Sequence, residues 1–224
     1  MHSATPAARG LLLDIGGVVL QNGRQLVRAR ASRFPAVAAY VEGVDFAGPG
    51  DELWQAMLRH EVTERAYWAR RAAEIGRVLG HDGWETFDLI EWLYDDPERG
   101  WLIGDTVELM KEVKAAGMPL VALTNDLVAF HGQEWADRQE WLDHFDTIVD
   151  GSTTGVLKPD PDAYALAVEA IGLPPEEVVY LDDLPVNVAG GRAAGLQAIE
   201  VLHADASPAI TEARRRLGLQ QVPA

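Results

Sequence analysis

The stretch LLLDIGG at residues 11–17 decides how this chain folds. Its apolar run has the length and composition of a buried β-strand, and it ends in a carboxylate at Asp14. Gly16 and Gly17 then loosen the backbone directly after the strand. Polar residues at the carboxyl ends of strands lie where parallel α/β sheets bind their ligands. The stretch therefore predicts a first strand and a candidate site residue.

Three further segments complete this arrangement along the chain. ALTND at residues 122–126 and VYLDD at residues 179–183 end apolar runs in Thr124 and in the acidic pair Asp182 and Asp183. VLKPD at residues 156–160 offers Lys158, which the proline after it favours in an extended conformation. A carboxylate, a hydroxyl, a lysine and an acidic pair are the groups needed to attack a phosphoryl group, hold it, neutralise its charge and anchor a hard cation.

Helices and strands alternate in the second half of the chain. Apolar runs predict strands at 11–15, 120–123, 147–149, 178–181 and 198–201. Between and after them, periodicity and capping signals predict helices at 105–116, 127–143, from 161 to near 172, 186–194 and 208–217. Alternation of this kind predicts an α/β fold with a Rossmann-like parallel sheet and helices on both of its faces.

The segment between the first two strands has a different pattern. Residues 21–97 show helical periodicity and no convincing buried strand, the clearest helix running from Thr63 to Leu79. Residues 95–100 have the composition of a hinge. We therefore expect a core formed by residues 1–20 and 98–224, and an inserted all-helical domain at 21–97.

Composition excludes several classes of function. The 224 residues carry a formal net charge of −16, so nucleic acid and anionic membrane are poor partners. The absence of cysteine excludes disulfide and thiolate chemistry and is compatible with a cytoplasmic location, which we expect. The six histidines form no His-x-x-x-His pair, which argues against a zinc site. No signal peptide or membrane span is expected, and the chain is expected to be a monomer or a homodimer.

The four motifs, in this order and spacing, resemble the haloacid dehalogenase superfamily, in the branch with a helical cap inserted after the first motif. The resemblance covers nearly the whole chain. It implies that Asp14 is the nucleophile that forms an aspartyl-phosphate, that Thr124 and Asn125 bind substrate, and that Lys158 offsets charge on the phosphate and on Asp14. It also implies a Mg²⁺ site formed by Asp14, the Gly16 carbonyl and Asp183, with Asp182 beside it or in the second shell and Asn187 supporting the cluster.

One part of the resemblance is missing. Most phosphatases of the family have a second aspartate at position 16, which serves as general acid and then as general base, and glycine cannot do this. Candidates to replace it are His60 and Glu61, just before the helix that starts after Thr63. We expect four tryptophans of the insert to pack in its core: Trp54, Trp68, Trp84 and Trp92. We expect four arginines near its start to form a solvated helix face: Arg24, Arg28, Arg30 and Arg33.

Three functions fit these residues. The first is Mg²⁺-dependent hydrolysis of a small phosphorylated metabolite. With glycine at position 16, this enzyme would be slow, limited to good leaving groups, or supplied with an acid from another residue. The second is dehalogenation of a 2-haloacid, which tolerates Gly16 because halide leaves without a proton but gives Asp182 and Asp183 no purpose. The third is a weakly catalytic protein that binds a phosphorylated ligand. Metal dependence of activity separates the first from the second, and ligand-induced stabilisation without product release indicates the third.

Overall fold

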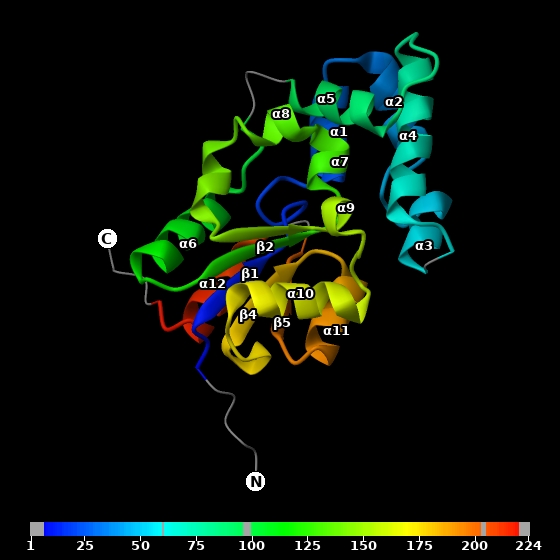
Figure 1. The fold of residues 1–224 in the computed structure, drawn as a ribbon. Coiled ribbons are helices and arrows are strands. Elements are labelled where there is room, and N and C mark those ends of the chain that lie inside the picture. The colour runs from blue at the N-terminus through cyan, green and yellow to red at the C-terminus, as the bar shows by residue number, and fades with distance from the viewer. Residues whose placement is uncertain (1–6, 60, 96–99, 203–204, 220–224) are drawn as a thin grey trace. The chain divides into compact units, whose positions relative to one another are not determined.

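A five-stranded, wholly parallel sheet forms the centre of the α/β part of the protein (Figure 1). The computed structural model describes residues 7–59, 61–95, 100–202 and 205–219. The strand order is β3-β2-β1-β4-β5, and the strands are β1 (Gly10–Leu13), β2 (Leu120–Thr124), β3 (Thr147–Asp150), β4 (Val178–Asp182) and β5 (Gln197–Glu200). The five predicted strands are all present, with bounds within two residues of those expected.

The first strand occupies the middle of the sheet and is buried throughout. Leu11 pairs with Leu120 of β2 on one side and with Val179 of β4 on the other. Its four residues are all apolar or glycine, which suits a strand covered on both faces. The carboxyl ends of β2, β1 and β4 therefore lie next to one another.

Helices cover both faces of the sheet, as the alternation predicts (Figure 1). On one face, α10 (Pro161–Ile171) and α11 (Pro185–Ala193) pack over a core that includes Leu12, Val121 and Tyr180. On the other, α6 (Gly104–Ala115) and α12 (Ser207–Arg216) pack together and against the strands. α10 starts as expected: the Asp160 side chain accepts a hydrogen bond from Asp162 N at 3.0 Å, and Pro161 occupies the first turn.

The single helix predicted at 127–143 is wrong. The structure has three short elements there: α7 (Leu127–His131), α8 (Gln133–Ala136) and the 3₁₀ turn η1 (Glu140–His144). Gly132 has a φ of +80°, a left-handed conformation that ends α7. Two further short elements, α9 (Gly151–Thr154) and the 3₁₀ turn η2 (Pro175–Glu177), connect strands to helices in this part of the chain.

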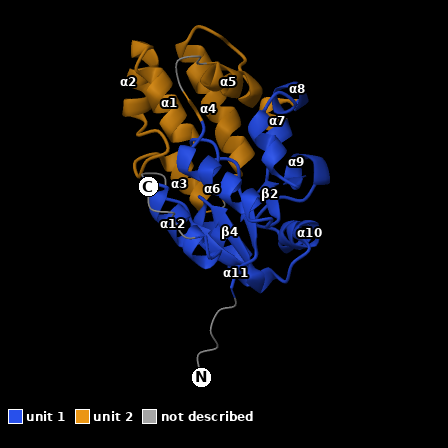
Figure 2. Ribbon diagram, turned by 90° about the vertical axis from the view of Figure 1, so that its left-hand side faces the viewer, with its two compact units in different colours: residues 1–21, 102–128, 133–224 blue, residues 22–101, 129–132 orange. Residues whose placement is uncertain are grey.

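The chain divides into two compact units (Figure 2). Unit 1 contains the sheet and is formed by residues 1–21, 102–128 and 133–224, whereas unit 2 is formed by residues 22–101 and 129–132. The short segment 129–132, at the end of α7, was not expected in unit 2. The predicted hinge at 95–100 lies mostly outside the described residues.

Unit 2 is helical across its described residues. Its helices are α1 (Gly23–Ala31), α2 (Pro35–Gly43), α3 (Glu52–Leu58), α4 (Glu64–Val78) and α5 (Thr86–Tyr94). Thr63 caps α4 as predicted, accepting a hydrogen bond from Ala66 N at 3.2 Å. Trp54 and Trp68 pack edge-on against Tyr67, and Trp84 packs against Trp92, so these four tryptophans contribute to packing within unit 2.

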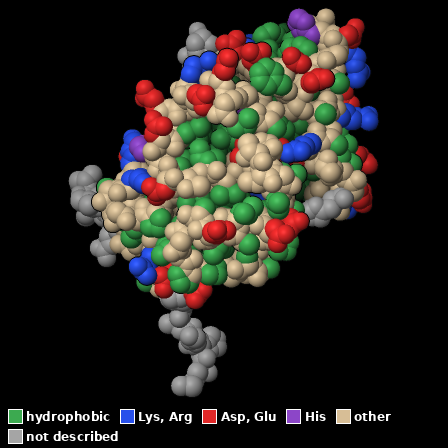
Figure 3. Space-filling model, viewed as in Figure 1, with side chains coloured by type: hydrophobic (Ala, Val, Ile, Leu, Met, Phe, Trp, Pro, Cys, Tyr) green, Lys and Arg blue, Asp and Glu red, His purple; other side chains and the backbone are tan. Residues whose placement is uncertain are grey.

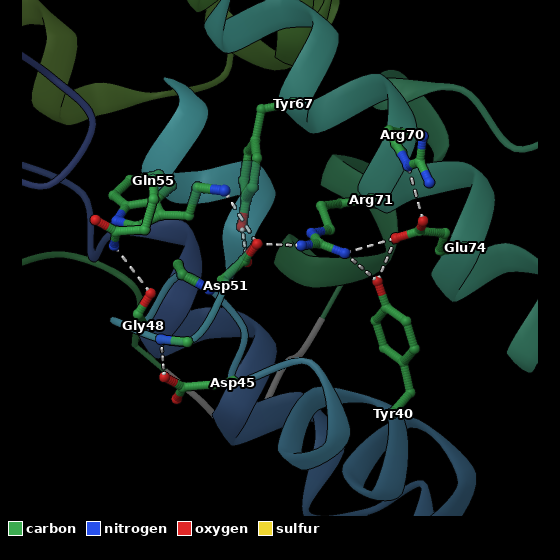
Figure 4. Close-up of polar contacts among 12 residues, drawn as sticks. Tyr40, Asp45, Gly48, Asp51, Gln55, Tyr67, Arg70, Arg71 and Glu74 are labelled. Carbon is green, nitrogen blue, oxygen red and sulfur yellow. Dashed lines mark hydrogen bonds and ion pairs between the residues drawn. The ribbon is translucent and has the colours of Figure 1, made fainter. Parts of the chain in front are cut away.

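A buried polar cluster joins three elements of unit 2 (Figure 4). Asp51, just before α3, is paired with Arg71 of α4 and also accepts a hydrogen bond from the Tyr67 hydroxyl at 3.1 Å. Arg71 also contacts Glu74 Oε2 at 2.7 Å and the Tyr40 hydroxyl of α2 at 2.9 Å. The side chains of Asp51 and Arg71 are 0% and 6% exposed, so this pair lies in the interior of unit 2.

The surface carries the acidic excess of the composition. Figure 3 shows acidic side chains scattered over the visible face, with basic side chains between them. The arginines near the start of unit 2 are not uniformly solvated: Arg28 lies 3.6 Å from Asp45, and Arg30 stacks over the Trp92 ring at 5.1 Å. Across the described residues, the helices are too short or too polar to cross a bilayer.

Candidate active site

The middle strands of the sheet bring the first and fourth motifs together. Asp14 directly follows β1, and Asp182 is the last residue of β4. Asp14 N donates to Leu181 O at 2.9 Å, which continues the ladder between these two strands to the site. Thr124 ends β2, on the other side of β1, and is 6% exposed. The sequence thus places three motif residues at the carboxyl ends of the three middle strands, which we call the carboxyl edge of the sheet.

Lys158 reaches this edge from the loop between α9 and α10. Its Nζ lies 2.9 Å from Asp14 Oδ1 and 2.7 Å from Asp182 Oδ2, with the lysine side chain 1% exposed. Asn125 holds the loop: its Oδ1 accepts from Lys158 N at 2.8 Å, and its Nδ2 donates to Lys158 O at 3.2 Å. Asn125 therefore fixes the backbone of Lys158, and its contact with substrate stays a prediction.

The carboxylate of Asp182 is surrounded by hydrogen-bond donors. Oδ2 accepts from Lys158 Nζ, from the Tyr180 hydroxyl and from Asn187 Nδ2 at 3.2 Å. Oδ1 accepts from Leu184 N at 2.9 Å and from Asn187 Nδ2 at 3.1 Å. Asp182 is fully buried, and these contacts offset the cost of burying its charge.

Burial dominates the electrostatics of Asp14. Loss of solvent raises the pKa of Asp14 to about 7; the Lys158 ammonium opposes this rise, and the Asp182 carboxylate adds to it. Burial also disfavours the charged form of Lys158, but Asp14 and Asp182 outweigh this effect and raise the pKa of Lys158 above its ordinary value. Lys158 therefore stays cationic at neutral pH.

The site has the composition of a binding site for a divalent cation. Asp14, Asp182 and Asp183 each offer an oxygen, and these oxygens lie within 4.8 Å of one another. Three carboxylates facing one ammonium leave two negative charges when all are ionised, which a divalent cation balances. Carboxylate and carbonyl oxygens are also the ligands that Mg²⁺ prefers. The residues present thus fit the metal that the resemblance implies.

The two glycines after Asp14 have different surroundings. A Cβ built on Gly17 would lie 2.1 Å from Asp183 Oδ2, and the φ of Gly17 is +74°. Gly17 thus lets the Asp183 carboxylate approach the backbone closely. A Cβ on Gly16 would meet no atom within 4 Å. Position 16, where the resemblance expects an aspartate, is open space in the structure.

Several residues escaped the sequence prediction. Tyr180 was read as a strand residue only, yet its hydroxyl contacts Asp182. Asp150, at the end of β3, accepts from Val128 N and Ser152 N at 2.8 Å each, and so holds the first turns of the two short helices α7 and α9. Alternation along a strand could have placed Tyr180 on the side of Asp182. His60, a proposed replacement for the missing acid, lies outside the described residues, and Glu61 pairs with Arg59 at 2.8 Å.

Comparison with protein families gives a match over most of the chain. The model of the haloacid dehalogenase-like hydrolase family matches residues 8–195. Acyl-CoA dehydrogenase family member 10 of Mus musculus is 24% identical over 209 residues, which are 89% of this chain and 18% of that protein. The chain therefore spans less than a fifth of the length of this relative.

Two further proteins are similar over most of their own length. Phosphoserine phosphatase of Thermus thermophilus is 25% identical over 205 residues, covering 88% of this chain and 82% of that one. The structure of L-2-haloacid dehalogenase from Xanthobacter autotrophicus with chloropropionic acid covalently bound aligns with a TM-score of 0.58. That alignment has 21% identity and covers 87% of this chain and 77% of the other. At this identity the structural likeness shows the α/β fold.

Proposed function

Because the chain belongs to the haloacid dehalogenase-like hydrolase family, we propose that it is a Mg²⁺-dependent phosphatase acting on a small phosphorylated metabolite. One observation carries this choice: Asp14, Asp182 and Asp183 lie within 4.8 Å of one another beside Lys158. A dehalogenase needs no metal, and three clustered carboxylates without a cation repel one another. The similarity to a phosphoserine phosphatase supports the same choice.

Asp14 is the nucleophile in this proposal. Its carboxylate attacks phosphorus, the P–O bond of the ester breaks, and an aspartyl-phosphate forms. Water then attacks this intermediate, which releases orthophosphate and restores Asp14. Lys158, held 2.9 Å from Asp14, stabilises the phosphoryl oxygens, and Thr124 donates a hydrogen bond to one of them. With glycine at 16, the leaving oxygen takes its proton from water or from the substrate itself.

Asp14, Asp183 and the Gly16 carbonyl would hold the Mg²⁺. Bound there, the ion supplies positive charge to the phosphoryl oxygens. Asp182 is already engaged by Lys158, Tyr180, Asn187 and the Leu184 amide, so we place it beside the metal. We further propose that unit 2 is the cap that selects the substrate and that the protein acts in the cytoplasm.

The first experiment measures orthophosphate released from p-nitrophenyl phosphate and from a panel of sugar and other small metabolite phosphates. Each substrate is tested with Mg²⁺ and with EDTA, on the full chain and on Asp14→Asn. Asp162→Asn, at an exposed position of α10, serves as the matched control. We expect release that requires Mg²⁺, disappears in Asp14→Asn and persists in Asp162→Asn.

Other outcomes contradict the proposal in different ways. Chloride release from 2-chloropropionate in EDTA would identify a dehalogenase instead. Thermal stabilisation by orthophosphate and Mg²⁺ without turnover of any substrate would indicate a ligand-binding protein. Phosphate release that survives Asp14→Asn would remove the assigned nucleophile.

A further inference from the structure

Two tyrosines lie buried beneath the pair formed by Lys158 and Asp182. Tyr164 of α10 and Tyr180 of β4 are both fully buried, and their rings pack edge to face with centroids 6.0 Å apart. Each hydroxyl has a partner at this depth. Tyr180 donates to Asp182 Oδ2, and Tyr164 donates to the backbone oxygen of Asn187 at 2.9 Å. One hydroxyl thus contacts a charged group of the site, whereas the other contacts backbone.

Helix α11 leaves space for both rings. A Cβ built on Gly190 would lie 2.5 Å from the Tyr164 hydroxyl oxygen, and one on Gly191 would lie 2.6 Å from Tyr180 Cδ1. Glycine within a helix costs about 0.5–1 kcal/mol relative to alanine. Two consecutive glycines therefore destabilise the helix itself. They make room for the rings of Tyr164 and Tyr180, whose hydroxyls reach Asn187 O and Asp182 Oδ2.

The Tyr180 hydroxyl shares an acceptor with the catalytic lysine. Lys158 Nζ contacts Asp182 Oδ2 at 2.7 Å and Asp14 Oδ1 at 2.9 Å, so two carboxylates compete for one ammonium. Every other hydrogen-bond donor to Asp182 Oδ2 offsets part of the negative charge on that oxygen. Each such donor therefore weakens the attraction between Asp182 and Lys158. Tyr180 also places its ring centroid 6.0 Å from Lys158 Nζ. The tyrosine therefore donates a hydrogen bond to one member of the pair and places its ring near the other.

We propose that Tyr180 is a positioning residue: its hydroxyl fixes Asp182 and shares the charge of Oδ2, which keeps Lys158 against Asp14 and available to the phosphoryl group. This inference rests on the proposed phosphatase function. Its geometric part concerns the lysine alone and can be tested without substrate.

The kinetic test compares Tyr180→Phe with Tyr164→Phe in the full chain, using p-nitrophenyl phosphate and Mg²⁺. Both variants keep the aromatic ring and lose one buried hydroxyl. The melting temperature of each variant therefore measures how much the loss of a buried hydroxyl destabilises the fold. We expect kcat to fall about tenfold in Tyr180→Phe with KM changed less than about twofold. Tyr164→Phe should keep its kcat within about twofold. Equal kcat values in the two variants, or a change confined to KM, would overturn the proposal.

Two amino acids introduced at position 180 separate donation from packing. Para-aminophenylalanine keeps the ring and offers an N–H donor, whereas para-methylphenylalanine has the bulk of tyrosine and no donor. We expect the amino variant to have a higher kcat than the methyl variant, and this comparison stands even where Tyr180→Phe does not fold. Equal kcat in these two variants would show that only the ring matters.

A crystal structure of a donor-free variant, Tyr180→Phe or the methyl variant, tests the geometry independently of activity. We expect Lys158 Nζ to move toward Asp182 and beyond hydrogen-bond distance of Asp14 Oδ1. A lysine that stays 2.9 Å from Asp14, as in the parent chain, would overturn the positioning role. If the parent protein releases no phosphate, the proposed function fails, and this structure still decides whether Tyr180 places the lysine.

Discussion

Gly16 is the residue at which this site differs most from a complete acid–base phosphatase. Position 16 is exposed, and a Cβ built there would meet no atom within 4 Å. General acid catalysis contributes about 10² to 10⁴ in rate, and most where the leaving group is a poor one. The proposed phosphatase should therefore prefer esters whose leaving oxygen needs no proton.

Gly16→Asp tests this directly. Because the position is open, we expect the variant to fold and its carboxyl group to reach the leaving group. Turnover of alkyl phosphates should rise by about 10²-fold, and turnover of p-nitrophenyl phosphate much less, since nitrophenolate leaves without protonation. The measurement is kcat/KM over phosphates whose leaving groups span a wide range of pKa.

Gly16→Asn is the matched control, because it has the same size and no acidic proton. It should leave the dependence of rate on leaving-group pKa as it is in the parent chain. A folded, metal-binding Gly16→Asp variant with an unchanged dependence would show that the missing acid is supplied elsewhere or that the chemistry is not phosphoryl transfer.

Helix α4 shows how one element can depend on a single buried cation. Arg71 contacts Asp51, Glu74 and Tyr40, which come from three different elements or turns of unit 2. Arg70, its neighbour, contacts the other oxygen of Glu74 at 3.0 Å but is 68% exposed. The two arginines thus share a partner and differ in burial.

Arg71→Met should destabilise unit 2 strongly. Loss of the guanidinium leaves Asp51 buried without its counter-ion, which costs about 3 to 5 kcal/mol in the free energy of unfolding. Arg70→Met should cost less than about 0.5 kcal/mol, because an exposed pair is screened by water. Urea unfolding followed by tryptophan fluorescence measures both, since unit 2 contains Trp54, Trp68, Trp84 and Trp92.

The double variant Asp51→Leu with Arg71→Met distinguishes charge from packing. It removes both charges together, so it should recover much of the stability that Arg71→Met loses. If Arg70→Met and Arg71→Met lower the free energy of unfolding equally, the buried pair of Asp51 and Arg71 stabilises unit 2 no more than an exposed ion pair does.

Elements with local signals were predictable from the sequence. Strand β1 was recognisable by its apolar run, α10 by Asp160 and Pro161, and α4 by Thr63, because each signal lies within a few residues of the element that it defines. The break at Gly132 was missed: a glycine alone does not reveal a left-handed φ, and the helical periodicity continues on both sides of it.

Parts of the site that depend on tertiary contacts were not predictable. Asp14, Lys158 and Asp182 were identified by motif, and the structure brings them together. The role of Asn125 follows from which loop lies next to which strand, and no local pattern specifies this. Tyr180 lies two residues before Asp182 on the same strand, so alternation indicated its side of the sheet but not its hydrogen bond. The pair of Asp51 and Arg71 joins residues twenty positions apart, so it was equally invisible in the sequence.

At the scale of the molecule, the chain passes between the two units more often than one insertion requires. Residues 129–132 belong to unit 2 although the chain on both sides belongs to unit 1. His131 lies in this segment, with its ring 4.7 Å from the Tyr94 ring of α5. Burial lowers the pKa of His131 from 6.5 to about 4. The contact between this segment and α5 is therefore sensitive to acid.

The stability of unit 2 should depend on pH through His131. The folded protein holds this imidazole neutral, so its contribution is fully present above pH 6.5, decreases as the pH falls below that value, and is lost by about pH 4. The difference between the two pKa values corresponds to about 3 kcal/mol at most. Denaturant unfolding of the parent chain and of His131→Phe, at pH 7.5 and at pH 5, measures it.

His131→Phe should lose less stability than the parent between these two pH values, because phenylalanine keeps a ring beside Tyr94 and cannot be protonated. His144→Phe, in η1 of unit 1, is the control and should retain the parental pH dependence. The assignment fails if the parent and His131→Phe lose equal stability on acidification.

The central place of β1 in the sheet has a consequence for how the protein is made. Leu11 pairs with Leu120 and Val179, so β1 leaves the ribosome before both of its partner strands and has none until more than a hundred further residues have been synthesised. At typical elongation rates this interval is on the order of 5 to 20 s. Most of unit 2 is complete before β1 can pair. A strand that is buried throughout in the finished protein thus stays unpaired in nascent chains for this whole interval, and it is where we expect chaperones to bind during translation.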